Sequence, residues 1–376
     1  MTSLPGRKGL LPAGLADILY PNAQEQAIKI EKLLNVFSKF GYMRVKPPLV
    51  EYEDTLLSGG PGTELKESTF RIMDPLSQKM MALRSDVTAQ ISRIASTRLL
   101  HSPRPLRLSY SGDVLRVKGD SFNMERQKTQ VGAELIGQKS EYVDSEIILV
   151  CSKALQAIDI NNITIDINFP FLRRYLLEDN STFLKEKINE CIDRKDRQYL
   201  GKLKFSNKDI ILKFMNFSGS VDQHIKYLSE IKLNGVLSEI REYLFKVIKI
   251  IKNNNNDINI SIDLLENKGF KYHTGLTFTV FSELFKGEIV KGGSYKTLSN
   301  ETATGCTIYT EKINNEFNVK LNDLVYLPSL NMRDADLLIK KGYRVVFGNN
   351  YKINSEKEAL KMKCKYIWRN GKIFEI

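Results

Sequence analysis

The segment 130–135, Gln-Val-Gly-Ala-Glu-Leu, contains residue types that could bind a polar ligand. On a β-strand Gln130, Gly132 and Glu134 share one face, because side chains alternate between the two faces of a strand. A glycine between an amide and a carboxylate leaves a hollow with a polar group on each side. From this strand alone, however, we expect a solvated sheet face, because such side chains are mostly exposed.

Two further segments carry groups of the same kind. Where a strand runs into a helix, Asp86 and Thr88 offer a carboxylate and a hydroxyl, although either could simply cap the helix. In the glycine-flanked segment 269–278, Tyr272 and His273 offer a phenol and an imidazole, although both rings could simply pack on a sheet at a turn. The residues alone leave these alternatives open.

The hydrophobic pattern predicts the elements that must position these groups. Helices are expected at 24–41 and 141–158, and a hairpin at 70–73 and 80–83 around an Asp-Pro-Leu-Ser turn. A strand at 43–50 contains Pro47 and Pro48, which suit only an edge strand or a strand end. Further strands are expected at 106–110, 113–117, 128–136, 162–168, 258–264, 276–282 and 303–309.

The pattern changes twice along the chain, which predicts four parts. Helical periodicity dominates from about residue 170 to an Asn-rich run at 252–257, and the last residues alternate short strand and helix patterns. The expected parts are the first half of a core at 1–169, a helical insertion at 170–256, the second half of the core at 257–322 and a small α/β domain at 323–376.

Composition excludes several classes of function. The 376 residues carry a formal net charge of +12, but lysines sit singly along the chain, so we do not expect nucleic-acid binding. The four cysteines lie tens of residues apart with three histidines in all, which argues against a metal site and disulfides. No export signal or membrane-spanning run is visible, so a cytoplasmic protein without membrane association is expected.

In order and spacing, the three polar segments resemble the histidine-contacting motifs of histidyl-tRNA synthetase, a class II synthetase. Residues 11–17, 48–51 and 292–295 are similar to other motifs of that family, and the second of these resembles its dimer-forming first motif. The resemblance spans about residues 9 to 315. It implies an α+β fold with a class II synthetase-like antiparallel sheet flanked by helices, extended by the helical insertion and the small α/β appendage.

Free histidine needs a carboxylate and neutral acceptors for its ammonium, a carboxylate or hydroxyl for its imidazole, and a donor for its carboxylate. The resemblance implies that Asp86, Thr88 and Gln130 hold the ammonium, that Glu134 holds the imidazole and that Tyr272 closes the site. Asp86 stands where the synthetase has a glutamate, which keeps the charge on a shorter side chain.

The resemblance also implies two further histidine-binding residues. Arg116 matches the arginine that the synthetase places on the α-phosphate, and His273 replaces a synthetase tyrosine. The expected site contains no catalytic residue, no metal ligand and no cofactor.

Six positions depart from the synthetase pattern where ATP would bind. At four of them a lysine stands where the synthetase has an arginine or an acidic residue, and at one a glycine stands where it has an arginine. At the sixth a tyrosine replaces the glycine that makes room for adenine. These positions are Lys118, Gly119, Lys268, Lys271, Tyr309 and Lys312. Lysine lacks the paired, planar donors of arginine, so transition-state stabilisation should fall by several kcal/mol, on the order of a lost oxyanion donor.

A histidine site without an ATP site resembles the regulatory subunits of ATP phosphoribosyltransferase. That resemblance implies a non-catalytic chain that joins a short-form catalytic subunit in a four-plus-four assembly, with a homodimer of this chain as building block, and that binds free L-histidine for feedback inhibition of the first step of histidine biosynthesis. The alternatives are a divergent histidyl-tRNA synthetase that activates histidine with ATP, and an amino-acid-binding paralogue that modifies another macromolecule.

Overall fold

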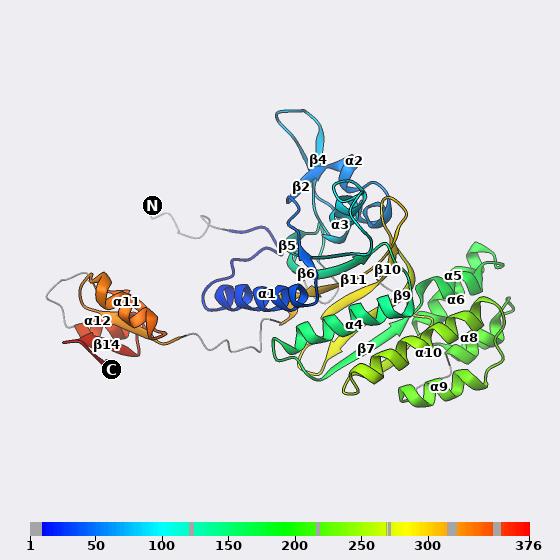
Figure 1. Cartoon of the computed structure of the whole chain (residues 1–376). Helices are drawn as coiled ribbons and strands as arrows, with labels where there is room; N and C mark the ends of the chain where they lie inside the picture. The colour runs from blue at the N-terminus through cyan, green and yellow to red at the C-terminus, as the bar shows by residue number, and fades with distance from the viewer. Residues whose placement is uncertain are drawn as a thin grey trace, which may run out of the picture. The chain divides into compact units, whose positions relative to one another are not determined.

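The computed structural model describes residues 10–119, 124–215, 219–267, 269, 272–313, 322–348 and 355–376. The chain divides into two compact units, Met1–Phe317 and Asn318–Ile376, and each is described by itself (Figure 1). No helix among the described residues has the length and apolar character needed to cross a membrane.

The larger unit is built on a mixed sheet of eight strands in the order β1-β5-β6-β11-β10-β9-β7-β8. The strands are β1 (Met43–Arg44), β5 (Leu106–Leu115), β6 (Gln127–Ile136), β7 (Ile163–Asn168), β8 (Asn259–Ile262), β9 (His273–Ser282), β10 (Val290–Lys296) and β11 (Thr302–Tyr309). The six central strands pair antiparallel, as expected, whereas β1 and β8 pair parallel to their neighbours. Parallel pairs need long connections, and six helices lie between β7 and β8.

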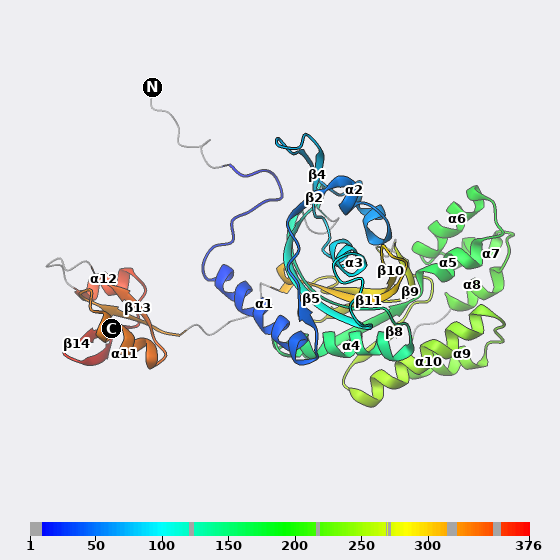
Figure 2. The same ribbon diagram turned by 45° about the horizontal axis from the view of Figure 1, so that its top comes forward.

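Helices cover both faces of this sheet. The helices α1 (Asn22–Lys39), α4 (Glu141–Gln156) and α10 (Val236–Asn254) lie on one face, and α3 (Thr88–Ser96) lies on the other (Figure 2). The side chain of Ser140 caps α4 by accepting a hydrogen bond from the amide of Val143. The main hydrophobic core lies between the sheet and the first group of helices, and its members include Phe37, Leu135 and Ile147.

The predicted hairpin is confirmed within a separate three-stranded sheet. Its strands are β2 (Val50–Tyr52), β3 (Arg71–Met73) and β4 (Met80–Leu83), in the order β2-β4-β3, and α2 (Glu53–Leu56) and the 3₁₀ helix η1 (Gly60–Leu65) connect β2 to β3. The predicted strand at 43–50 is wrong as a single strand. Pro47 and Pro48 cannot donate to a ladder, so β1 ends before them and β2 starts after them in the other sheet.

Among the described residues between β7 and β8, the chain forms six helices. They are α5 (Pro170–Leu177), α6 (Thr182–Asp193), α7 (Arg197–Lys202), α8 (Lys208–Phe214), α9 (Val221–Glu230) and α10. The buried guanidinium of Arg173 joins three segments here, because it donates to Asn189 and Asp193 of α6 and to Asn267, which follows β8.

The smaller unit is a four-stranded sheet in the order β13-β12-β14-β15 with two helices. Its elements are β12 (Leu324–Leu327), α11 (Met332–Lys340), β13 (Arg344–Phe347), α12 (Ser355–Lys361), β14 (Tyr366–Arg369) and β15 (Lys372–Glu375). The first three strands are parallel and β15 is antiparallel. The sequence predicted every element of this unit except β15.

Two expectations for the strands of the large sheet need correction, and one strand was missed. Segments 106–110 and 113–117 are not separate strands, because β5 runs from Leu106 to Leu115 without a break and Ser111 and Gly112 both pair with β6. The strand β10 was not expected, because its Gly-Gly pair interrupts the apolar pattern. The polar face of β6 is not solvated. Gln130 and Glu134 are 0% and 1% exposed because side chains from neighbouring strands and α3 cover them.

Candidate functional site

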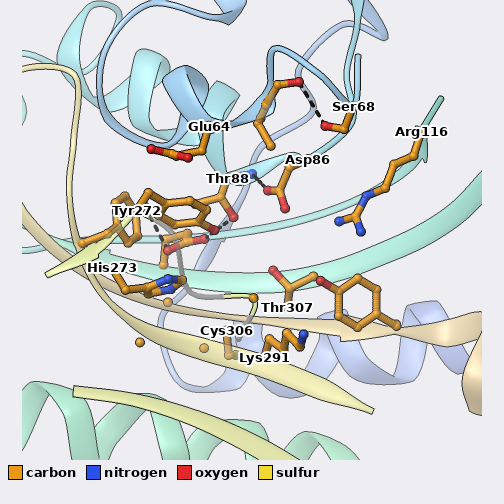
Figure 3. A pocket seen from close by; sticks show the side chains of 18 of the residues that line it. Glu64, Ser68, Asp86, Thr88, Arg116, Tyr272, His273, Lys291, Cys306 and Thr307 are labelled. Atoms are coloured by element: carbon orange, nitrogen blue, oxygen red, sulfur yellow. Dashed lines mark hydrogen bonds between the residues drawn. The ribbon is translucent and has the colours of Figure 1, made fainter. Parts of the chain in front are cut away.

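A cavity of about 420 Å³ opens over the polar face of the large sheet (Figure 3). The walls come from η1, the junction of β4 and α3, the end of β5 and the strands β9, β10 and β11. Six of the seven predicted histidine-binding residues line this cavity, and they are Asp86, Thr88, Arg116, Glu134, Tyr272 and His273. Segments far apart in the sequence therefore meet at one place.

Asp86 lies at the start of α3 with both carboxylate oxygens engaged. The backbone amide of Thr88 donates to Oδ1 at 2.8 Å, and Nε2 of Gln130 donates to Oδ2 at 3.3 Å. The first contact satisfies one of the helix's unpaired N–H groups, so Asp86 both supports the helix and faces the cavity. Two N–H donors suit the carboxylate form of Asp86.

Gln130 lies behind Asp86 and does not line the cavity. Its side-chain oxygen accepts a hydrogen bond from the amide of Val87 at 2.9 Å, and its Nε2 donates to Asp86. Both ends of the amide are thus engaged within the protein. The geometry gives Gln130 the role of orienting Asp86.

Glu134 is the most deeply buried carboxyl group of the cavity. Its Oε1 accepts from the Thr88 hydroxyl at 3.2 Å, and its Oε2 accepts from the Tyr295 hydroxyl at 3.0 Å. Burial raises the pKa of Glu134 to about 8. The hydroxyl donors oppose this shift and the negative charge of Asp86 adds to it.

Glycine at position 305 makes room for this carboxyl group. Gly305 pairs with Glu134 across β11 and β6, and a Cβ atom at this position would lie 1.7 Å from Glu134 Oε2. A residue with a side chain would therefore displace the glutamate. The hollow that the sequence suggested at Gly132 is instead filled by the ring of Tyr110, whose hydroxyl would lie 2.4 Å from an added Cβ.

Aromatic rings form one wall of the cavity. The rings of Tyr272 and His273 stack at a centroid distance of 4.4 Å, and Tyr272 meets Tyr295 edge to face at 5.9 Å. Burial, helped by the charge of Lys291, lowers the pKa of His273 to about 3. His273 is therefore a neutral ring near neutral pH.

Two cationic side chains and one tyrosine also line the cavity. Arg116 and Lys118 both line the cavity, and Arg116 Nε donates to the carbonyl oxygen of Ser85 at 3.3 Å. Tyr309, one of the departures from the synthetase pattern, is buried and also lines the cavity. Burial raises its pKa to about 12, although the charge of Arg116 opposes this.

The other four departures from the synthetase pattern do not contribute a described side chain to the cavity. Lys268 and Lys271 are outside the described residues, and so is the side chain of Lys312. Gly119 is described but does not line the cavity.

Sequence reasoning missed several lining residues. Tyr295, which bonds Glu134, lies in the Gly-Gly-Ser-Tyr motif that the sequence had singled out, so the motif was a usable signal. Glu64 and Lys291 gave no such signal, because isolated charged residues are common in this chain.

Carboxyl groups and cationic side chains line the same cavity. This combination suits a zwitterionic amino acid.

Comparison with known proteins agrees with this fold. A family model described as histidyl-tRNA synthetase matches residues 14–313. The chain is 38% identical to the ATP phosphoribosyltransferase regulatory subunit of Rhodospirillum centenum, over 98% of this chain and 96% of the relative. It is 35% identical to the protein of the same name from Gluconobacter oxydans, over 96% of each chain.

Solved structures share the same fold. An ATP phosphoribosyltransferase regulatory subunit/histidyl-tRNA synthetase from Bacillus halodurans superposes with a TM-score of 0.79 at 20% identity, covering 96% of this chain and 97% of the other. A histidyl-tRNA synthetase from Nostoc sp. PCC 7120 gives a TM-score of 0.78 at 17% identity, covering 98% and 96%.

Proposed function

The chain belongs to the histidyl-tRNA synthetase-like family of ATP phosphoribosyltransferase regulatory subunits, and we propose that it is a non-catalytic subunit that senses free L-histidine. It joins a short catalytic subunit, which carries out the first step of histidine biosynthesis, and transmits feedback inhibition to it. The observation that carries this proposal is the cavity over β6, whose lining contains two buried carboxyl groups and three cationic side chains.

We place histidine in this cavity by matching its charged groups to the lining. Its ammonium lies against Asp86 and the Thr88 hydroxyl, with Gln130 holding Asp86 in place. Its imidazole reaches Glu134 beside the ring of Tyr272. Charge-assisted hydrogen bonds of this kind are worth about 1.5–3 kcal/mol each, so both ends of the ligand contribute to affinity.

Two other residues of the lining contact the carboxylate of histidine or disfavour the binding of ATP. The carboxylate of histidine points toward Arg116, whose guanidinium offers paired donors. The buried side chain of Tyr309 occupies the lining where the synthetase pattern has glycine, which disfavours adenine. Arg116 alone supports the competing role of a divergent histidyl-tRNA synthetase, because it can serve a phosphate as well as a carboxylate.

Inhibition follows if histidine binds two assembly states with different affinity. The ratio of the two affinities sets how far histidine can shift the complex toward its inactive state. A homodimer of this chain is the building block that we propose for the larger assembly.

Titration calorimetry of the complex with the catalytic subunit tests the proposal. The unmodified chain should bind histidine, and Asp86→Ala should weaken binding about tenfold or more, since a buried charge-assisted contact is lost. Histidine inhibition of the catalytic subunit should weaken in parallel. Glu67→Gln is the matched control, because Glu67 is exposed, adjoins Ser68 and does not line the cavity.

Two results would contradict the proposal. One is the absence of histidine binding by the assembled complex at millimolar ligand. The other is histidine-dependent exchange of pyrophosphate into ATP by this chain alone, which would make it a synthetase.

A further inference from the structure

The two buried carboxyl groups of the cavity have different kinds of hydrogen-bond partner. Asp86 accepts from the backbone amide of Thr88 and from the side-chain amide of Gln130. These groups only donate, so they suit a carboxylate. Glu134 instead meets the hydroxyls of Thr88 and Tyr295, and a hydroxyl can either donate or accept. Only Glu134 can therefore keep a proton without losing its partners.

No cation neutralises Glu134 in the part of the chain that the structure describes. Its partners there are hydroxyl groups, and its side chain is almost completely buried. The nearby titratable groups are Asp86 before α3, Tyr110 on β5, Tyr272 and His273 at the start of β9, Tyr295 on β10 and Cys306 on β11. Arg116, Lys118 and Lys291 line the same cavity, and Glu64 stands at it from η1.

The buried tyrosines, Cys306 and His273 do not change charge between about pH 5 and pH 9. Burial raises the pKa of Tyr110, Tyr272 and Tyr295 well above the ordinary tyrosine value, so they stay neutral. Hydrogen bonding to the neighbouring Cys151 and burial raise the pKa of Cys306, which stays a thiol. His273 is already neutral, so Glu134 is the neighbour whose protonation can respond to a ligand.

We propose that Glu134 holds a proton in the empty cavity and passes it to the imidazole of histidine, so that the bound pair carries a single proton. The inference rests on the proposed function. In this step the O–H bond of Glu134 breaks, an N–H bond forms on the ring, and the products are a carboxylate and an imidazolium. No other reactant is needed. Both charges then face each other away from water, where their attraction is strong.

Proton exchange with the solvent then depends on pH in a defined way. Below a pH of about 6.5 free histidine arrives with a charged ring, so binding releases the proton of Glu134. Between that value and about 8 the proton moves only within the pair, and binding exchanges none with the solvent. Above about 8 Glu134 is ionised in the empty cavity, and binding takes up one proton from water.

Titration calorimetry of the full-length chain in buffers of different ionisation enthalpy measures this exchange directly. The unmodified chain should release about one proton near pH 5.5 and exchange almost none near pH 7. Near pH 9 Glu134 should take up about one proton, in addition to any uptake by the ligand's own ammonium. The uptake by Glu134 alone should lower the affinity for histidine about tenfold per pH unit above pH 8.

Near pH 9 the amino group of free histidine also takes up protons when it binds as an ammonium. Glu134→Gln separates the proton taken up by Glu134 from this uptake by the ligand. The variant should lose one proton of uptake near pH 9, whereas the control Glu67→Gln should keep it. Equal uptake by Glu134→Gln and the unmodified chain overturns the proposal, as does binding at pH 9 with no buffer dependence. No binding heat by the unmodified chain at any pH contradicts the histidine site itself and thus the proposed function.

Infrared difference spectra of the unmodified chain provide a test that needs no variant. Addition of histidine near pH 7 should remove one protonated-carboxyl band and add one carboxylate band. Persistence of the protonated-carboxyl band after saturation overturns the transfer. This readout remains decisive if Glu134→Gln does not fold or does not bind histidine.

Discussion

Asp86 and Glu134 line the same cavity, yet of the two only Glu134 has hydroxyl partners among the described residues. A hydroxyl group can rotate and accept a hydrogen bond from a protonated carboxyl group. The distinction arises from neighbours contributed by other strands, because Tyr295 comes from β10 and Gly305 of β11 leaves the space. A buried acid that stays protonated near neutral pH is a recognised way of tuning a site. It also makes the stability of the empty protein depend on pH.

Glu134→Gln should change that pH dependence. The pKa of Glu134 is raised from 4.5 to about 8 on folding, so between these values the folded protein retains a proton that the unfolded chain releases. Its contribution to the free energy of unfolding is therefore greatest at low pH and is lost as pH rises to about 8. The unmodified protein should lose on the order of a few kcal/mol across this range, and the variant should lose less.

Urea unfolding of the ligand-free protein near pH 5 and near pH 9 measures this effect. The control Glu67→Gln should follow the unmodified protein at both values. A variant whose stability falls with pH as steeply as that of the unmodified protein would mean that Glu134 ionises freely in the folded state.

At the residue scale, sequence reasoning selected residues that the structure brings together where a single motif carried each polar group. Asp86, Thr88 and Glu134 each stand in a segment with its own polar pattern, and all three line the cavity. The sequence could not tell a residue that lines the cavity from one that only orients a lining residue. The position of Gln130 behind Asp86 depends on how β6 packs against the start of α3, which no single segment specifies.

At the element scale, the N-terminal half of α4 is fixed to the back of the sheet by one buried acid. Asp144 is 1% exposed and accepts hydrogen bonds from Ser294 of β10 at 2.9 Å, Thr304 of β11 at 2.7 Å and Tyr243 of α10 at 2.7 Å. Ser294 and Thr304 are neighbours of Tyr295 and Gly305, which shape the cavity on the opposite face. Asp144 therefore couples helix packing to the strands of the site.

Asp144→Ala should destabilise the protein by about 2–4 kcal/mol, because the buried hydroxyl groups of Ser294 and Thr304 and the partly buried hydroxyl of Tyr243 lose their acceptor. Tyr243→Phe removes one donor and leaves the other two bonds in place, so about 1 kcal/mol is expected. Chemical denaturation measures both. The exposed Asp179 offers the control Asp179→Ala, which should change stability little. Equal effects of Asp144→Ala and Asp179→Ala would contradict the coupling.

The elements that the sequence predicted best are the long amphipathic ones. The expected helices at 24–41 and 141–158 correspond to α1 and α4, because apolar residues at helical spacing face a large core. The short helices α5, α7, α8 and α9 were not assigned, since six to ten residues provide too few turns for a clear period. β10 was missed because its glycines serve close packing and contribute no apolar signal.

At the scale of the whole molecule, the sequence predicted the antiparallel centre of the sheet but not its parallel edges. The edge strand β1 has two residues, and a pattern that short cannot indicate its partner. Exposed apolar side chains lie on this edge and in the segments that flank it. Phe40 before β1 is 48% exposed, Met43 of β1 59% and Leu49 after β1 48%, and Tyr52 of β2 in the neighbouring sheet is exposed as well. Within the described residues β1 has a strand partner on one side only, and an open edge with apolar side chains nearby is suited to pair with another copy of the chain.

Met43→Lys should therefore weaken the proposed homodimer, because a charged side chain would be buried where two copies meet. Multi-angle light scattering should give a dimer for the unmodified chain and a smaller average mass for the variant across a concentration series. Tyr175→Lys is the control, since Tyr175 is an exposed aromatic residue of α5 and should leave the mass unchanged. Histidine binding by Met43→Lys should persist, because Met43 does not line the cavity. A monomeric unmodified chain, or a variant that remains dimeric at the lowest concentration, would show that this edge is not the interface.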